Sequence, residues 1–209
     1  IVICGKKELH GCNFTVMPDR IAAATYLSCA ACAKGEIILK KCCPKHLDAV
    51  LSVLEQLGCS ISFTEDEIFF SGKEPLHSID IIRTMVYPGF PTDCQAFIMS
   101  AACIAQGTTV FVENIFENRY RHAEELRRMG ANIRTEGKVA VVEGVKKLYG
   151  AKVCAPDLRG GAGLVAAALC ADGKTEISGV NHIDRGYEDI ENVLAGAGAD
   201  IKRIDTYGL

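Results

Sequence analysis

The sequence lacks both an excess of charge of one sign and any long hydrophobic run. Its formal net charge is only -3, so nothing global suggests nucleic acid or a membrane surface as a partner. No apolar run approaches the roughly 20 residues of a membrane-spanning helix. Residues 1–5 are expected to form a strand rather than a targeting segment. The chain is therefore expected to be globular, and any anionic ligand must be bound by a local group of cations.

Low-complexity and Pro/Ser-rich segments are also absent, so no linker divides the chain. Cysteine, in contrast, is abundant: there are 11, an odd number, and most lie within apolar runs. This usage is typical of reduced cytosolic proteins, in which cysteine acts as a small hydrophobic residue. Cys29 and Cys32 have the spacing of a metal or redox pair, but they lie in an alanine-rich run without a suitably spaced histidine. We expect a cytoplasmic protein with no metal and no cofactor.

An internal repeat is the strongest structural signal in the chain. Three alanine-rich runs, at residues 21–33, 95–105 and 163–171, are each followed by a glycine turn and a strand-like segment. Glycine is the residue best suited to the left-handed position that follows a helix. In the three copies this position is expected at Gly35, Gly107 and Gly173.

A second helix is expected after each of these strands, at residues 46–57, 122–129 and 187–197. These helices also end in glycine and lead into short strands. The glycines recur at intervals of about 70 residues, and they are Gly58, Gly130 and Gly198. The strands after them are expected at residues 59–61, 131–133 and 199–201.

The two helices of each copy differ in character, and this difference predicts the fold. The first helix is apolar all round and is therefore buried on every side, whereas the second has a single apolar face. We predict one α/β domain in which three βαβαβ-type units surround three buried central helices with three-fold pseudo-symmetry. The repeats are expected at about 1–75, 76–145 and 146–209, the first and last being incomplete.

Asp93 lies where a loop is expected to become a buried helix. Two prolines bracket a glycine in residues 87–91, which cannot be the interior of a helix. A carboxylate at this position is able to cap the helix by accepting hydrogen bonds from its first N–H groups. It is also held rigidly enough to present an oxygen to a ligand. The spacing alone leaves both interpretations open.

Aspartate and arginine recur near the start of each expected buried helix and before the second helices. Equivalent helix ends should meet at one edge of a pseudo-symmetric domain. Guanidinium groups and helix N-termini together favour binding of phosphate or carboxylate groups there. The alternative is that each residue only caps a helix or pairs with its neighbour. The residues expected at this edge are Asp19, Arg20, Asp93, Arg119, Asp157, Arg159 and Arg185.

Five motifs, spread in order over nearly the whole chain, resemble those of the enolpyruvyl transferases. They lie at residues 87–96, 116–120, 126–131, 156–159 and 182–188. The motifs are most similar to those of members that act on UDP-N-acetylglucosamine. The resemblance implies an inside-out barrel of repeated units and a partner domain within the same protein, with the active site in the cleft between the two domains.

The resemblance also implies a reaction. The family moves the enolpyruvyl group of phosphoenolpyruvate to the 3′-hydroxyl of UDP-N-acetylglucosamine and releases phosphate, which begins peptidoglycan synthesis in the bacterial cytoplasm. By this resemblance, Asp93 stands at the position of the general base that holds this hydroxyl, and Ile115 at a position that contacts the nucleotide sugar. Arg159 and Arg185 stand at positions that face phosphoenolpyruvate and the departing phosphate. Supporting positions in the cleft are Asp157, Arg119 and Arg20.

Two other interpretations remain. One is an enolpyruvyl transferase that acts on shikimate 3-phosphate, 3-phosphoshikimate 1-carboxyvinyltransferase, although residues 116–120 and 182–188 favour the nucleotide-sugar enzyme. The other is a non-catalytic repeat domain whose Asp/Arg edge binds an anion. Cys12 superficially resembles the catalytic cysteine of the family, but it precedes residues 17–20, where the family has an ordinary turn. We assign it no catalytic role.

This polypeptide alone is therefore expected to bind ligands weakly and to show no turnover, because the cysteine loop and an N-terminal Lys-Asn pair of the family are absent from it. The measurement is phosphate release by the purified 209-residue chain with phosphoenolpyruvate and UDP-N-acetylglucosamine. Measurable product, with contaminating enzyme excluded, would refute the expectation.

Overall fold

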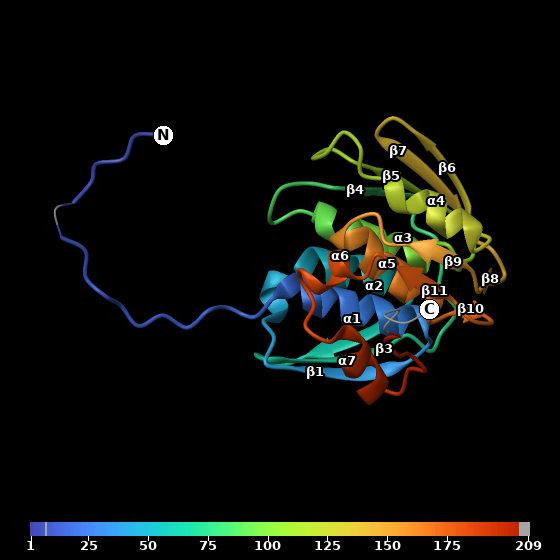
Figure 1. Cartoon of the computed structure of the whole chain (residues 1–209), viewed down its shortest axis with the longest axis horizontal. Coiled ribbons are helices and arrows are strands. Elements are labelled where there is room, and N and C mark those ends of the chain that lie inside the picture. Colours follow the sequence, from blue (N-terminus) through green and yellow to red (C-terminus); the bar gives the residue numbers. More distant parts are fainter. Residues whose placement is uncertain (7, 205–209) are drawn as a thin grey trace.

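A computed structural model describes residues 1–6 and 8–204 of the chain. Residues 205–209, at the end of the expected third repeat, lie outside this description. Figure 1 shows residues 1–6 and 8–19 in extended stretches that lead away from the folded body. The described residues of this segment are exposed and form no helix or strand. The strand predicted at residues 1–5 is therefore wrong: a strand needs a neighbour for its backbone hydrogen bonds, and none lies beside these residues.

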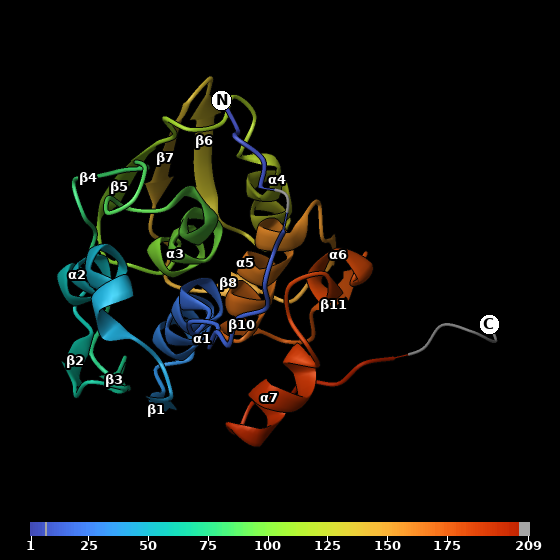
Figure 2. The same ribbon diagram turned by 90° about the vertical axis from the view of Figure 1, so that its left-hand side faces the viewer.

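Three helices occupy the centre of the molecule: α1 (Arg20–Cys32), α3 (Gln95–Ala102) and α5 (Leu158–Ala168). They contact one another pairwise and lie side by side within a surround of sheets and outer helices (Figure 2). Every residue of α3 is buried, and so are most residues of α1 and α5. The predicted α/β class and the three buried central helices are confirmed.

Small residues allow α3 and α5 to approach closely. A Cβ atom added to Gly163 would lie 3.0 Å from the backbone carbon and oxygen of Ala96, which is closer than ordinary van der Waals contact. The Ser100 hydroxyl donates a hydrogen bond of 2.8 Å to the backbone oxygen of Gly163 across the same contact. The alanine and glycine content of these runs thus sets the distance between two central helices.

The outer helices are α2 (Asp48–Gln56), α4 (Arg121–Arg128) and α7 (Ile190–Gly196), with a short α6 (Asn181–Asp184) before α7. Each of α2, α4 and α7 is followed by the predicted glycine in a left-handed conformation. Gly58, Gly130 and Gly198 have φ values of 102°, 93° and 102°, and paired backbone hydrogen bonds close each last turn.

Glycine was also expected at the left-handed position directly after each central helix, and this prediction is wrong. Lys34, with φ 53°, takes the left-handed position after α1 in place of Gly35. Its N–H and that of Gly35 bond back to Ala31 and Ala30, which holds a conformation that lysine adopts only at some cost. Gly107 and Gly173 do have positive φ, but they lie in later turns, because α3 and α5 end at Ala102 and Ala168.

Sheets flank the helices on the outside. One sheet has the order β1-β3-β2 and another the order β4-β5-β7-β6, while β10-β8 and β11-β9 form two-stranded parallel pairs. The strands of the two larger sheets are β1 (Glu36–Lys40), β2 (Ser60–Phe63), β3 (Glu67–Ser71), β4 (Ile81–Arg83), β5 (Thr108–Val112), β6 (Asn132–Glu136) and β7 (Val139–Glu143). The remaining short elements are β8 (Leu148–Tyr149), β9 (Lys152–Cys154), β10 (Ala171–Asp172), β11 (Glu176–Ser178), η1 (Pro44–His46) and η2 (Thr92–Cys94).

The strands predicted after Gly58 and Gly130 correspond to β2 and β6, but residues 199–201 form no strand. β2 and β6 pair with the antiparallel strands β3 and β7. Within the described residues, the expected third repeat has no counterpart of β3 or β7, so residues 199–201 have no partner. A strand-like sequence pattern does not form a strand without one.

The close contact of α3 and α5 predicts that Gly163→Ala destabilises the protein by about 1–3 kcal/mol, since an added methyl group overpacks the contact. The matched control is Gly196→Ala on α7, where an added Cβ meets nothing within 4 Å. It is expected to be neutral or to stabilise by up to about 1 kcal/mol. Urea unfolding of both variants measures the difference, and equal stabilities would contradict this account of the helix contact.

Candidate active site

Asp93 lies in η2, at the entrance to α3, after a loop that contains a cis peptide bond between Tyr87 and Pro88. Its carboxylate makes no capping hydrogen bond to η2 or α3. The capping interpretation is therefore wrong for this residue. The Asp93 side chain is 41% exposed, so a carboxylate that the helix does not use remains accessible from solvent.

Two guanidinium groups meet this carboxylate. Nη2 of Arg119 lies 3.1 Å from Oδ1 of Asp93, and Nη2 of Arg159 lies 3.5 Å from Oδ2. Arg119 comes from the loop before α4, and Arg159 from the first turn of α5. Both arginine side chains are more than four-fifths buried. One negative and two positive charges leave an excess positive charge, which favours an anionic ligand.

Aromatic rings fix the planes of these guanidinium groups. Arg119 lies over Phe116 and Arg159 over Tyr187, with 5.3 Å and 5.8 Å to the ring centroids. Arg159 also donates a hydrogen bond of 3.2 Å to the Tyr187 hydroxyl, which in turn lies 2.7 Å from Oγ1 of Thr25 on α1. Burial raises the pKa of Tyr187 above its ordinary value. This chain of contacts links α1 and α5 to the carboxylate at the start of α3.

Two of the predicted site aspartates are helix caps. Asp19 accepts from the N–H groups of Ile21 and Ala22 at the start of α1. Asp157 accepts with Oδ1 from the N–H groups of Arg159 and Gly160 at the start of α5. The capping alternative holds for both, and the cap on α5 fixes the backbone from which Arg159 extends.

Within the described residues, Arg20 and Arg185 form no ion pair with this group. The guanidinium of Arg20 lies 5.5 Å from the ring centroid of Tyr87, in the loop before Asp93. Arg185 is exposed, and within the described residues its side chain forms no ion pair or hydrogen bond; the residue lies two positions before Tyr187. The structure therefore brings Asp93, Arg119 and Arg159 together. Asp19 and Asp157 cap the central helices, Arg20 lies at Tyr87, and a place for Arg185 in the site stays a prediction.

Ile115 lies in the loop between β5 and Arg119, and the residue is 39% exposed. Its backbone N–H donates a hydrogen bond of 2.8 Å to the carboxylate of Glu113. Only the carbonyl of Ile115 is therefore left for a backbone contact with a ligand. The sequence analysis missed Glu113, because a single glutamate after an apolar strand resembles an ordinary surface residue, yet it is only 1% exposed.

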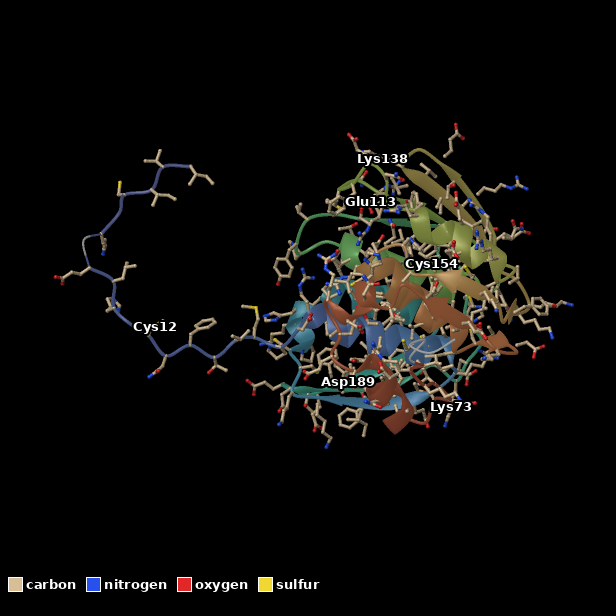
Figure 3. The ribbon with its side chains drawn as sticks, viewed as in Figure 1. Cys12, Lys73, Glu113, Lys138, Cys154 and Asp189 are labelled. Carbon is tan, nitrogen blue, oxygen red and sulfur yellow. The ribbon has the colours of Figure 1, made fainter. Side chains whose placement is uncertain are left out.

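Cys12 lies on the extended segment outside the folded body (Figure 3). Among the described residues, no group of three or more histidine, cysteine, aspartate or glutamate side chains is arranged to hold a metal ion. Likewise, no described helix is both long and apolar enough to cross a membrane.

Three comparisons relate this chain to known proteins. Residues 1–194 match the family described as EPSP synthase (3-phosphoshikimate 1-carboxyvinyltransferase). UDP-N-acetylglucosamine 1-carboxyvinyltransferase 2 of Caldanaerobacter subterraneus is 49% identical over 98% of this chain and 49% of that protein. The UDP-N-acetylglucosamine 1-carboxyvinyltransferase of Desulfofundulus thermocisternus is 48% identical over 97% of this chain and 84% of that protein.

A solved structure of an enolpyruvyl transferase is also similar to this chain. The enolpyruvyl transferase NikO from Streptomyces tendae matches with a TM-score of 0.79 and 27% identity, over 90% of this chain and 45% of that one. The chain spans about half the length of most of the curated relatives it matches.

The buried side chain of His122 on α4 provides a test of the packing around this site. Burial lowers its pKa from 6.5 to about 4; the charge of Asp157 opposes this shift and that of Arg119 adds to it. Its Nε2 atom is buried without a hydrogen-bond partner. Because the pKa is lower in the folded state, the unfolded chain takes up the proton first as the pH falls. The stabilisation by neutral His122 is therefore complete above pH 6.5 and is lost as the pH falls toward 4.

We expect the wild-type chain to lose about 2 kcal/mol more stability between pH 7 and pH 5 than the variant His122→Leu. Urea unfolding of both proteins at the two pH values provides the comparison. If both lose the same stability, His122 titrates normally and is not buried as the structure describes it.

Proposed function

The chain belongs to the EPSP synthase family of enolpyruvyl transferases, and from this premise we propose that it is one domain of a UDP-N-acetylglucosamine 1-carboxyvinyltransferase. Relatives with that name are 44–49% identical over nearly the whole chain, which supports this acceptor over shikimate 3-phosphate. The enzyme would transfer enolpyruvyl from phosphoenolpyruvate to the 3′-hydroxyl of UDP-N-acetylglucosamine, the first committed step of peptidoglycan synthesis, in the cytoplasm. A second domain would complete the cleft, and the three repeats would divide this one at about residues 75 and 145.

The observation that carries the proposal is the Asp93 carboxylate between two arginines. In the proposed reaction, the acceptor oxygen forms a bond to C2 of phosphoenolpyruvate, and Asp93 takes the hydroxyl proton. A general acid of the second domain donates a proton to C3. Loss of that proton and of phosphate from the tetrahedral intermediate then regenerates the enol double bond in the product.

The arginines have a defined part in this proposal. The 3.5 Å separation of Arg159 from Asp93 exceeds a normal hydrogen-bond length. Phosphoenolpyruvate would therefore displace only a weak contact when it binds the Arg159 guanidinium in its present position, which would free Oδ2 of Asp93 to accept the proton. Arg119 keeps the carboxylate in place through Oδ1. Arg185 would join Arg159 at the phosphate, and such preorganised charges stabilise the negative charge that develops in the transition state.

The substrate contacts follow from the same loops. Ile115 would contact the nucleotide sugar through its carbonyl, because Glu113 already holds its N–H. Asp157 would act indirectly, by capping α5 and so fixing Arg159. Arg20 would border the cleft beside Tyr87.

The variant Asp93→Asn, made in the full-length protein that carries this chain, keeps the size of the side chain but removes its basicity. We expect kcat to fall by about 10²–10⁴-fold, the usual contribution of a general base. The control is Asp80→Asn, an exposed aspartate of the same repeat, which should leave kcat unchanged. The assay is phosphate release with both substrates. Near-normal turnover of Asp93→Asn would mean that this domain supplies no general base, which leaves only the interpretation of a non-catalytic, anion-binding domain.

A further inference from the structure

The Glu113 carboxylate bridges the two segments that carry Asp93 and Arg119. Glu113 follows β5, and its backbone N–H donates to the carbonyl of Lys138, which lies nearby in Figure 3. Within the described residues no cation pairs with Glu113. A buried carboxylate without a counter-ion is unfavourable unless hydrogen bonds satisfy it fully. Five hydrogen bonds of 2.8–3.0 Å do so, from Thr84, Thr92, Gln95, Ile115 and Phe116.

Each carboxylate oxygen serves one side of the site. Oε2 accepts from the Thr92 hydroxyl and the Gln95 amide, the residues before and after the Asp93–Cys94 pair. Oε1 accepts from the backbone N–H groups of Ile115 and Phe116, in the loop that leads to Arg119, and from the Thr84 hydroxyl. One side chain therefore sets the separation between η2 and this loop.

We propose that Glu113 is a positioning residue, which sets the distance of the Asp93 carboxylate from Arg119 and from the Ile115 carbonyl. This inference rests on the proposed function for its consequence in catalysis, but its geometry stands on the hydrogen bonds alone. None of the five hydrogen bonds of Glu113 is made to Asp93, Arg119 or Arg159, so its hydrogen bonds influence these residues only through the segments that carry them. What matters is therefore the length of the side chain and its capacity to bond on both sides.

Two substitutions separate length from charge. Glu113→Asp keeps the charge but shortens the side chain by one carbon, so that the carboxylate no longer reaches both sides. Glu113→Gln keeps the length and loses the charge. Its oxygen still accepts from Ile115 and Phe116, and its NH₂ group faces Thr92 and Gln95. The Thr92 hydroxyl can accept from it, and Gln95 can present Oε1, which is buried without a partner.

The first experiment is steady-state kinetics of the full-length protein with phosphoenolpyruvate and UDP-N-acetylglucosamine. Glu113→Asp should lower kcat by about 10²-fold, the effect of a misplacement of about 1 Å. The KM for the acceptor should rise as well, because the Ile115 carbonyl would shift with the loop. Glu113→Gln should retain more activity than Glu113→Asp. The control Glu143→Gln, an exposed glutamate on β7, should match the wild type. Equal or higher activity of Glu113→Asp than of Glu113→Gln overturns the proposal, since charge would then be the property that matters.

If Glu113→Asp fails to fold, Thr92→Val decides the question. It removes one of the five hydrogen bonds to Glu113, on the Asp93 side, and keeps the shape of the Thr92 side chain. A kcat reduced by about tenfold or more supports positioning, and an unchanged kcat contradicts it.

The second experiment, hydrogen exchange of the 209-residue chain, does not depend on the proposed reaction. The amides of Ile115 and Phe116 should exchange at least about tenfold faster in Glu113→Asp than in the wild type. The amide of Val142, in the β6–β7 pair, should not change. Unchanged exchange at all three positions, or equal acceleration at all three, would overturn the positioning role. Absence of wild-type turnover together with the predicted exchange would reject the proposed function and keep the positioning role.

Discussion

The close approach of α3 and α5 is the constraint on which the site depends. Where Gly163 faces the backbone of Ala96, an added Cβ would lie only 3.0 Å away, so the two helices lie nearer than bulkier residues would permit. The first turn of α5 is then within reach of η2. This proximity allows Arg159 from α5 to meet Asp93 from η2. Helix N-termini also carry partial positive charge, which adds to the attraction that this edge exerts on anions.

Residues that do not face the ligand fix the charged groups of the site. Asp157 caps α5 next to Arg159, and the Tyr187 hydroxyl accepts a hydrogen bond from the Arg159 guanidinium. Glu113 plays the corresponding part for the second repeat, since it fixes the segments on both sides of the Asp93–Arg119 pair. Such support leaves the outward atoms of Asp93 and Arg159 free for a ligand, which is how preorganised electrostatic sites avoid reorganisation during the reaction.

The periodic features of the sequence predicted much of this arrangement. Alanine-rich runs became buried helices and amphipathic runs became outer ones, because burial follows the distribution of apolar residues around a helix. The Asp/Arg edge followed from the repeat itself. The errors came from features that no local pattern encodes. Lys34 takes a left-handed position that glycine was expected to hold, and residues 199–201 lack a partner strand. Asp93 pairs with arginines that are 26 and 66 residues away in the chain, and Glu113 acquires its meaning only through contacts made after folding.

The most direct test of the account is a crystal structure of the full-length protein with UDP-N-acetylglucosamine bound. The quantity to measure is the distance from the Asp93 carboxylate to the 3′-hydroxyl oxygen of the acceptor. A base in position should lie about 2.6–3.2 Å from that oxygen, with Arg119 still bound to the same carboxylate. An acceptor whose 3′-hydroxyl points to a different residue, while Asp93 remains held by both arginines, would contradict the account.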